Sequence, residues 1–405
     1  MTAQALDVPG HVPPELVWDH SFADYLSELD DPYLAGGRLH DGPGVIWATN
    51  ASYGNPAWIF TRHSLIQEGF AKNKLFSNKR GPLTAAVLDP SWLMLPVEAD
   101  PPDHAQYREI LRPFFTPQAI DQRLGEVEGL TTSLIDAFID RGSCNFVTEF
   151  AEILPNAIVI SMMGMPGEML RQFLDWEADV TRGATNEIRM ASAAAIIAYL
   201  KDFIAEQRRA PTSDLMQAVI AGRMKDRPLT DVETLGIVYL LYVAGLDTVF
   251  ASLGWIMRHL AMHQDMQERL RGNPEAIRLA VEEFTRAFGV SSPSRTVAED
   301  IEFHGVTMKK GEDVLLPTFL AGRDPRAWAD PHVIDIDRKP RHVTFGAGPH
   351  ICLGIHLAKR EMRIMIEAFL SRMRNIRIAD GDSFAFHTTG TIGVDRLMLE
   401  WETIR

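Results

Sequence analysis

The spacing of apolar residues changes character along the chain. Near the start, the short apolar segments 45–48 and 57–60 lie between Pro, Gly and polar residues, a pattern that predicts strands. Beyond Arg295, apolar and polar residues alternate at 300–308 and 312–317, which also predicts strands. Between these regions apolar residues recur at three- and four-residue intervals, which predicts amphipathic helices at about residues 103–115, 119–140, 146–163, 167–183, 188–208 and 274–288.

The most informative predicted helix runs from about Asp231 to His263. Thr230 and Glu233 have capping-box spacing at its start. Its middle, residues 237–246, is apolar on every face, as a helix buried through the centre of a protein requires. At the standard rise this helix is roughly 45 Å long. We therefore expect it to form the core of the fold.

The remaining segments complete a mainly helical chain. Residues 324–350 are irregular and rich in proline, a long helix is expected from Cys352 to about Met373, and the last thirty residues alternate as strands do. There is no internal repeat and no segment long enough to be a linker. The sequence predicts a mainly α protein with a smaller β-rich part, in a single domain spanning residues 1–405.

Composition and charge narrow the possible functions. Of the 405 residues, 46% are hydrophobic and 23% are charged, which is ordinary for a globular protein. The formal net charge of −14 argues against a nucleic-acid binder, because such proteins need a basic surface. No apolar run approaches the roughly 20 residues needed to cross a bilayer. Residues 1–7 lack the basic flank and apolar stretch of a targeting signal, so we expect a cytoplasmic protein.

The two cysteines, Cys144 and Cys352, are too few for a disulfide framework. Cys352 lies in the glycine-rich segment Phe345-Gly346-Ala347-Gly348-Pro349-His350-Ile351-Cys352-Leu353-Gly354, directly before the predicted helix. Glycines let a backbone approach another group closely, and free N–H groups at a helix start favour a thiolate. A lone cysteine is more often a small buried apolar residue, and for Cys144 we expect a packing or surface position. The composition of its loop favours a metal-bound thiolate for Cys352.

This decapeptide resembles the haem-binding signature of the cytochrome P450 family, Phe-Gly-x-Gly-x-His-x-Cys-x-Gly. Two further family motifs are matched in order: residues 244–248 resemble the oxygen-activation motif, and Glu283 with Arg286 resembles the Glu-x-x-Arg pair. The similarity, which is to the bacterial camphor-hydroxylating group, extends over nearly the whole chain. It implies the cytochrome P450 fold, with haem b between the long central helix and the cysteine-loop helix. It also implies a monooxygenase in which Cys352 is the iron ligand.

Asp247 and Thr248 directly follow the apolar middle of the central helix. The resemblance implies that they deliver protons: the Thr248 hydroxyl would hydrogen-bond bound dioxygen or an ordered water, and Asp247 would feed protons inward. The alternative is structural. A threonine within a helix often donates to the carbonyl four residues earlier, here Ala244, and Asp247 would then only close a local polar network.

Charged residues also gain roles from the resemblance. Glu283 and Arg286 share a helix face, so they can pair, and the family pattern adds Arg338 to form a buried triad that holds the cysteine loop. The two haem propionates need cations or donors. Pro293 stands where the camphor enzyme has an aspartate near a propionate, so that contact is not expected. The residues that match the cofactor site are His104, Arg108, Arg295, Phe345, His350, Cys352 and Gly354.

The expected substrate is small and apolar. Trp92 falls where the camphor enzyme has a tyrosine that bonds its ketone substrate, and an indole is larger and only donates. A terpenoid or norisoprenoid ketone such as an ionone therefore fits better than camphor, with a camphor-type monoterpene hydroxylase as the alternative. Trp92 is otherwise a core residue that never meets substrate. The other expected lining residues are Leu83, Met94, Leu240, Val243, Ala244, Val290, Ser291 and Ile392.

Electrons are expected from another protein, because nothing in the chain resembles a flavin or iron–sulfur module. The resemblance implies a [2Fe-2S] ferredoxin with its ferredoxin reductase, docking where Arg108, Lys339, Lys359 and Arg360 gather basic charge. Two other classes stay open. A peroxide-driven haem-thiolate enzyme would have less need of Asp247 and Thr248, and a non-enzymatic haem sensor or carrier would usually bring an output domain.

Overall fold

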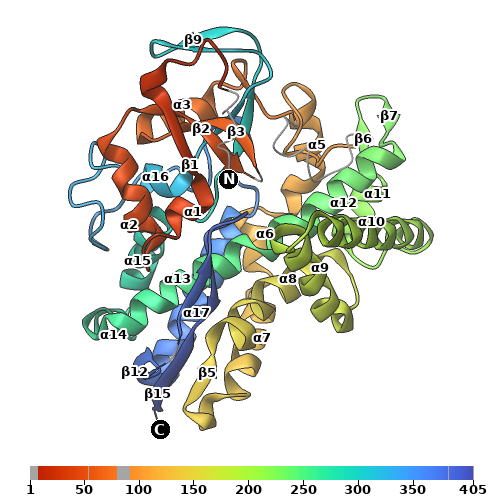
Figure 1. Ribbon diagram of the computed structural model, residues 1–405. Helices are drawn as coiled ribbons and strands as arrows, with labels where there is room; N and C mark the ends of the chain where they lie inside the picture. Colours follow the sequence, from red (N-terminus) through yellow and green to blue (C-terminus); the bar gives the residue numbers. More distant parts are fainter. Residues whose placement is uncertain (1–7, 53, 80–91, 382, 405) are drawn as a thin grey trace.

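The largest sheet of the protein has six strands and lies at the upper left of Figure 1, together with α1 (Phe22–Leu26), α2 (Pro32–Gly37), α3 (His63–Ala71) and α16 (Thr318–Arg323). The computed structural model describes residues 8–52, 54–79, 92–381 and 383–404. The strands predicted at 45–48, 57–60 and 312–317 are confirmed. The order across the sheet is β1 (Val17–Ser21), β2 (Val45–Ser52), β3 (Asn55–Phe60), β11 (Asp313–Leu315), β8 (Ser294–Val297) and β4 (Phe76–Ser77).

Within this sheet β1 pairs with β2 and β3 with β11 in parallel, while the other neighbours are antiparallel. The predicted strand 300–308 is instead a hairpin of β9 (Ile301–Phe303) and β10 (Val306–Met308). His304 and Gly305 at its turn have φ of +49° and +80°. Positive φ at both central residues is the geometry of a two-residue hairpin turn. The sequence pattern did not reveal this turn because His304 is not a usual residue for it.

The helices predicted from residue 103 onwards are present but more divided. The predicted helix 119–140 is two helices, and 146–163 begins as the π-helix Val147–Ala151. Thr116 caps the first of the two helices by accepting from Ala119 N–H, and Pro117 opens it, which separates it from its predecessor. The α-helices of this region are α5 (Asp103–Leu111), α6 (Pro117–Asp121), α7 (Leu124–Asp136), α8 (Ile153–Met163), α9 (Leu170–Arg182), α10 (Asn186–Arg209) and α11 (Asp214–Ile220).

The predicted central helix crosses the molecule as two helices, α12 (Asp231–Leu246) and α13 (Thr248–Met262), that meet at Asp247. Its capping box is confirmed, because Thr230 and Glu233 each accept the other's backbone N–H. The single uninterrupted helix that we expected is wrong. Asp247 has φ of −110° and ψ of −41°, and the side chain of Asn156 on α8 donates to the Leu246 carbonyl at 3.1 Å.

We expected no apolar run of membrane-spanning length, and the length and composition of this helix pair show that expectation to be wrong. By length and composition alone, the stretch Asp231–Met262 is long and apolar enough to cross a membrane, and its most apolar window has a mean hydropathy of 1.7. However, 61% of its apolar window is buried inside the protein. A core helix has this property, because the rest of the chain covers its apolar surface.

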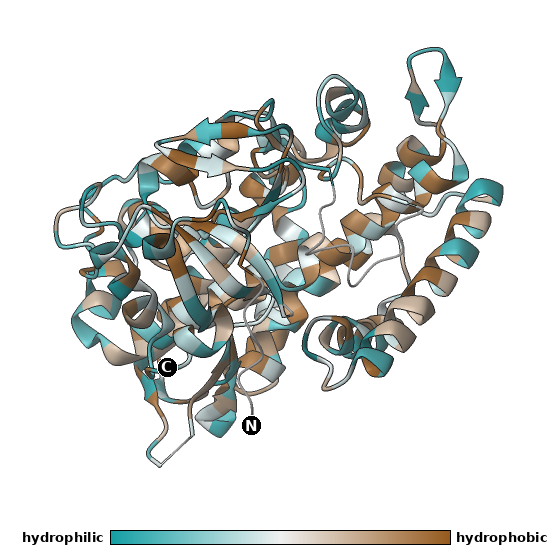
Figure 2. Cartoon of the chain, turned by 45° about the horizontal axis from the view of Figure 1, so that its top comes forward, coloured by the Kyte–Doolittle hydropathy of each residue, from teal (hydrophilic) through white to brown (hydrophobic). Residues whose placement is uncertain are grey.

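The C-terminal third adds the elements that surround the cysteine loop. Within residues 324–350, all of which are described, the only regular element is the short 3-10 helix Gly348–His350, as the irregular pattern predicted. Outside this third, the hairpin of β6 (Arg223–Met224) and β7 (Arg227–Pro228) projects from the molecule at the upper right of Figure 2. The later elements are α14 (Gln264–Leu270), α15 (Pro274–Ala287), α17 (Ile355–Arg372), β12 (Met373–Ile378), β13 (Ala385–His387), β14 (Gly393–Arg396) and β15 (Met398–Thr403), which lies between β12 and β5 (Ser143–Asn145).

Candidate active site

Two glycines shape the loop that carries Cys352. Gly346 and Gly348 have φ of +74° and +70°, a region that favours glycine. A Cβ on Gly348 would lie 3.3 Å from the carbonyl oxygen of Phe70, so the loop packs closely against α3. The N–H of Cys352 donates to the Phe345 carbonyl at 2.8 Å, which closes the loop and fixes the direction of the sulfur.

The sulfur of Cys352 precedes α17 rather than opening it as predicted, because that helix begins three residues later at Ile355. The N–H groups of Gly354 and Ile355 and the Arg108 guanidinium favour the thiolate, but burial has the larger effect and raises the pKa of Cys352. The chain alone therefore does not ionise this thiol. A metal cation at the sulfur would do so, because a coordinating thiol is deprotonated by the metal charge.

Cys352 is exposed to a cavity of about 410 Å³ that lies between the central helix pair and the cysteine loop. α12 and α13 contribute Leu240, Leu241, Ala244, Gly245 and Thr248 to its wall. Every residue that the sequence predicts for cofactor binding also lines it, namely His104, Arg108, Arg295, Phe345, His350, Cys352 and Gly354.

Four of these residues bring cationic or donor groups to the cavity with few acceptors for them. Arg295 is buried, and the one described hydrogen bond of its guanidinium runs to the Ser294 carbonyl at 2.7 Å. Both ring nitrogens of His350 lack a partner among the described residues, and its ring lies 3.8 Å from that of His104. Burial and the charges of His104, Arg295 and Arg108 lower the pKa of His350 to about 3. Such a cluster fits an anionic ligand, as the two carboxylates of haem would be.

Thr248 faces this cavity, whereas Asp247 is buried beside it. The Asp247 carboxylate accepts from the Thr391 hydroxyl at 2.6 Å and lies 3.5 Å from Arg182 Nη1. The Thr248 hydroxyl donates to the Ala244 carbonyl at 3.3 Å. The local contacts of the structural alternative are thus present. They leave the lone pairs of the Thr248 oxygen free to accept a hydrogen bond from a ligand in the cavity.

The residues predicted to contact substrate divide into three groups. Leu240, Ala244, Val290 and Ser291 line the cavity. Among the described residues, Trp92, Met94, Val243 and Ile392 do not line it. Leu83 lies outside the described residues. The wall also contains residues that the sequence did not suggest, including Pro96, Val97, Val159, Met162 and Leu215.

Trp92 occupies a core position in the structure. Its side chain is buried, and its ring meets that of Tyr239 edge-on at 4.8 Å. Edge-to-face packing of two aromatic rings stabilises such a contact. Trp92 thus packs as the alternative of a core tryptophan describes, and it does not line the described cavity.

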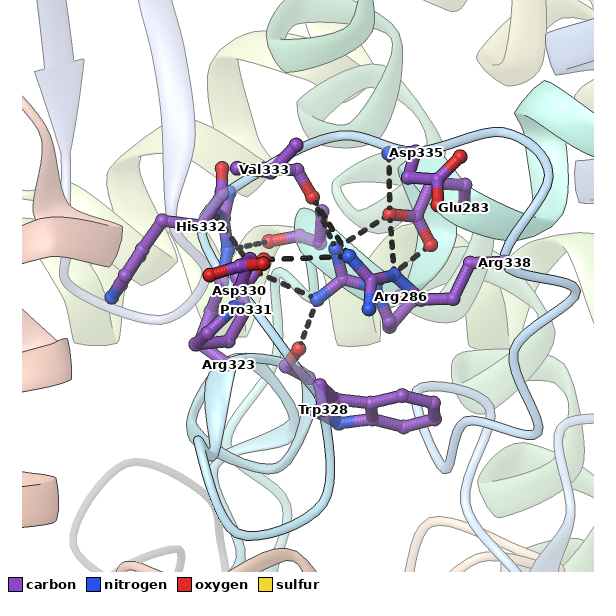
Figure 3. A network of polar contacts seen from close by, with 12 residues as sticks. Glu283, Arg286, Arg323, Trp328, Asp330, Pro331, His332, Val333, Asp335 and Arg338 are labelled. Carbon is purple, nitrogen blue, oxygen red and sulfur yellow. Dashed lines mark hydrogen bonds and ion pairs between the residues drawn. The ribbon is translucent and has the colours of Figure 1, made fainter.

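Glu283 and Arg286 form a fully buried bidentate pair, with Nε–Oε2 and Nη2–Oε1 distances of 2.8 and 2.7 Å (Figure 3). Arg338 Nε donates to the same carboxylate at 3.1 Å. Arg286 further donates to the carbonyls of Pro331 and Val333 at 2.9 and 3.2 Å. These contacts tie α15 to the irregular segment that leads to the cysteine loop. Each charge is satisfied by several partners, as a buried pair requires.

Two of the four cations predicted for docking are already paired. Lys359 Nζ lies 2.7 Å from Glu282, and Arg360 Nε lies 2.5 Å from Asp121. Arg108 donates to the Pro349 carbonyl at 3.3 Å and lines the cavity. The fourth, Lys339, is exposed. The positive charge available to a partner is therefore smaller than the sequence suggested.

Glu361 is an acidic group at the site that our sequence analysis missed. It lies on α17, lines the cavity and has no hydrogen-bond partner for either carboxylate oxygen among the described residues. Burial raises its pKa to about 8, so it is largely neutral near pH 7. Its spacing from the apolar positions Leu357, Ala358 and Met365 places it on the buried helix face, which was a usable signal.

Comparisons with known proteins agree with this geometry. A model of the family "Cytochrome P450" matches residues 137–287 and 275–377. "Probable cytochrome P450 127A1" of Sinorhizobium fredii is 32% identical over 404 residues, covering 97% of each chain. "Nocardicin C N-oxygenase" of Nocardia uniformis is 31% identical and covers 81% of this chain and 84% of its own length. The crystal structure of CYP101J2 is similar, with a TM-score of 0.87 and 29% identity over 98% of this chain and 100% of that one.

Proposed function

The chain belongs to the cytochrome P450 family, whose members are haem b monooxygenases, and we propose that it oxidises a small apolar substrate. The substrate class is a terpenoid or norisoprenoid ketone such as an ionone, and the reaction inserts one oxygen atom from O2 into an unactivated C–H bond. When bound, haem supplies the oxygen-activating chemistry. The observation that carries the proposal is the single apolar cavity that Cys352, the propionate-matching donors and Thr248 line together.

We assign Cys352 as the iron ligand. His104, Arg108, Arg295 and His350 would hold the propionates, because these groups crowd one part of the cavity wall and have few acceptors among the described residues. Phe345 and Gly354 complete the loop around the sulfur. Pro293 lines the cavity and has no N–H or charge to offer a propionate, so the cations carry that role.

The wall around the central helix supports an apolar substrate. Leu240, Ala244 and Val290 are apolar, and Ser291 is a nearby polar group that can hydrogen-bond a single carbonyl. Trp92 is packed against Tyr239 and is not among the residues that line the cavity, so it is not placed there as a donor for a ketone. The hydrogen bond that holds camphor in the camphor enzyme is therefore not expected here.

The experiment for this proposal is a binding and product assay with the haem-loaded protein. An ionone should change the visible absorption spectrum on binding and yield a hydroxylated product whose new oxygen comes from 18O2. A charged metabolite of similar size should produce neither change. A spectrum unaltered by every apolar ketone in the series would refute the substrate class and leave the family assignment intact.

Thr248 is expected to control how efficiently reducing equivalents become product. Its hydroxyl faces the cavity, and Asp247 lies next to it in the chain with a buried carboxylate. We expect Thr248→Ala to consume reductant while releasing hydrogen peroxide, with product per electron pair reduced about tenfold or more. Full coupling in Thr248→Ala would refute the role. Thr248→Ser, which keeps the hydroxyl, is the matched control.

We propose that a [2Fe-2S] ferredoxin and its reductase deliver electrons in the cytoplasm, with the ferredoxin docking near Lys339. This lysine is exposed and does not line the cavity, so reversing its charge leaves the cofactor site alone. We expect Lys339→Glu to raise the KM for ferredoxin about fivefold at low salt. Lys225→Glu on the β6–β7 hairpin is the matched control, because both lysines are exposed and have φ near +50°. Equal KM values in the two variants would contradict this docking site.

A further inference from the structure

A line of polar contacts connects Asp247 with the surface through the β13–β14 hairpin. Asp395 Oδ1 lies 2.6 Å from His387 Nδ1, and His387 Nε2 lies 3.4 Å from the Thr391 hydroxyl. That hydroxyl donates to Asp247 Oδ2 at 2.6 Å. The exposed fraction falls inward along the line, from 41% for the Asp395 side chain to 10% for that of His387. Thr391 and Asp247 are buried at 8% and 6%.

The hairpin is built to hold these groups in place. A Cβ on Gly393 would lie 2.4 Å from the ring of His387, so only glycine leaves room for the imidazole across the strand pair. Next to Thr391, the N–H of Ile392 donates to the Val290 carbonyl at 2.8 Å, and its carbonyl accepts from Trp255 Nε1 at 3.0 Å. Thr391 is thereby fixed between the hairpin and the central helix.

We propose that Asp395, His387 and Thr391 form a relay that carries protons from solvent to Asp247. A proton enters at Asp395 and passes to His387 Nδ1. The imidazole gives its Nε2 proton to the Thr391 oxygen while the Thr391 hydroxyl proton passes to Asp247 Oδ2. One proton enters, one is delivered, and no group is oxidised or reduced. Histidine suits the middle position because one ring nitrogen can accept a proton while the other donates one.

The surrounding charged groups set the orientation of the Asp247 carboxylate. Arg182 lies 3.5 Å from Asp247 Oδ1, which leaves Oδ2 to face Thr391. Glu177, 3.9 Å from Arg182, competes weakly for that cation, since burial and the charge of Asp247 raise the pKa of Glu177 to about 8. Near the surface, burial also raises the pKa of Glu152, a carboxyl that interacts with Asp395. The contact between His387 Nε2 and the Thr391 hydroxyl is the longest of the three. Proton transfer along the line therefore requires these two groups to move closer together.

The proposal rests on the proton-delivery role proposed above for Asp247, so Asp247→Asn is tested beside the relay variants. In the haem-loaded enzyme, Thr391→Val should lower the rate of product formation about tenfold and increase its solvent deuterium isotope effect. Thr391→Ser should restore at least half of the rate. Thr388→Val is the control, because that hydroxyl lies in the same hairpin but donates to the Ala23 carbonyl. An unchanged rate and isotope effect in Thr391→Val would overturn the relay.

A second readout does not depend on turnover. In the diamagnetic carbon monoxide complex of the reduced enzyme, Asp247→Asn should shift the 15N resonance of His387 Nε2. This shift should persist with Thr391→Ser and disappear with Thr391→Val. Persistence in Thr391→Val would show coupling through space and overturn the relay. If Asp247→Asn itself leaves product formation unchanged, the role of Asp247 fails; if it impairs turnover and Thr391→Val does not, the relay alone fails.

Discussion

Replacing Cys352 by alanine is expected to abolish monooxygenase activity while leaving a folded chain. The side chain of Cys352 faces the cavity rather than the packed core, so its loss removes few packing contacts. The thiolate is the ligand that favours O–O cleavage, and Cys352 is the only cysteine among the described residues of the cavity wall. We expect a loss of at least about a thousandfold, which corresponds to about 4 kcal/mol of transition-state stabilisation.

The measurement is the absorption spectrum of the reduced carbon monoxide complex, recorded with product formation. Cys144→Ala is the matched control, since Cys144 is the only other cysteine in the 405 residues. It lies on β5 opposite Leu399, and burial raises its pKa to about 12, so it is an inert packing residue. That variant should keep both the thiolate spectrum and the activity. A thiolate-type spectrum in Cys352→Ala would contradict the assignment.

The pattern of apolar residues was sufficient for the main elements of the fold, because burial imposes helical or alternating spacing on each element separately. It predicted α10, α15 and three strands of the large sheet, β2, β3 and β11, to within a few residues, but not β1, β8 or β4. It failed where one element depends on another. At the break before Asp247, the side chain of Asn156 donates to the Leu246 carbonyl from some ninety residues away. The sequence of α12 contains no pattern from which this contact could be predicted.

The candidate site shows the same division. The glycine loop and the cations around it are local motifs, so the family resemblance located them together. The substrate wall is made by side chains from α8, α11, α12 and the 290–293 segment, whose distances depend on packing. Trp92 shows that a match of sequence position does not fix the direction of a side chain. Its position matches a substrate contact of the camphor enzyme, but in the structure the Trp92 ring packs against Tyr239 in the core. The contact between Thr391 and Asp247 likewise joins residues that only the fold brings together.

Replacing Arg286 by alanine is expected to yield little folded haem protein. The side chains of both partners are fully buried, so the variant leaves the Glu283 carboxylate in the core with Arg338 and the Asp335 N–H as its remaining partners. It also removes the donor to the carbonyls of Pro331 and Val333, which precede the cysteine loop. Breaking a buried pair typically costs about 3–5 kcal/mol, a large share of the roughly 5–15 kcal/mol that stabilises a native domain.

The same helix provides the control for this prediction. Glu275 and Arg278 have the identical three-residue spacing on α15, but their side chains are 67% and 59% exposed. An exposed pair contributes at most about 1 kcal/mol, so Arg278→Ala should unfold in denaturant near the midpoint of the native protein and bind a full complement of haem. Arg286→Ala should lose both properties, as measured by denaturant titration and haem content. Equal stability of the two variants would contradict the prediction. It would show that the buried Glu283–Arg286 pair contributes no more to stability than the exposed pair, and that its contacts to the segment before the cysteine loop are not needed for folding.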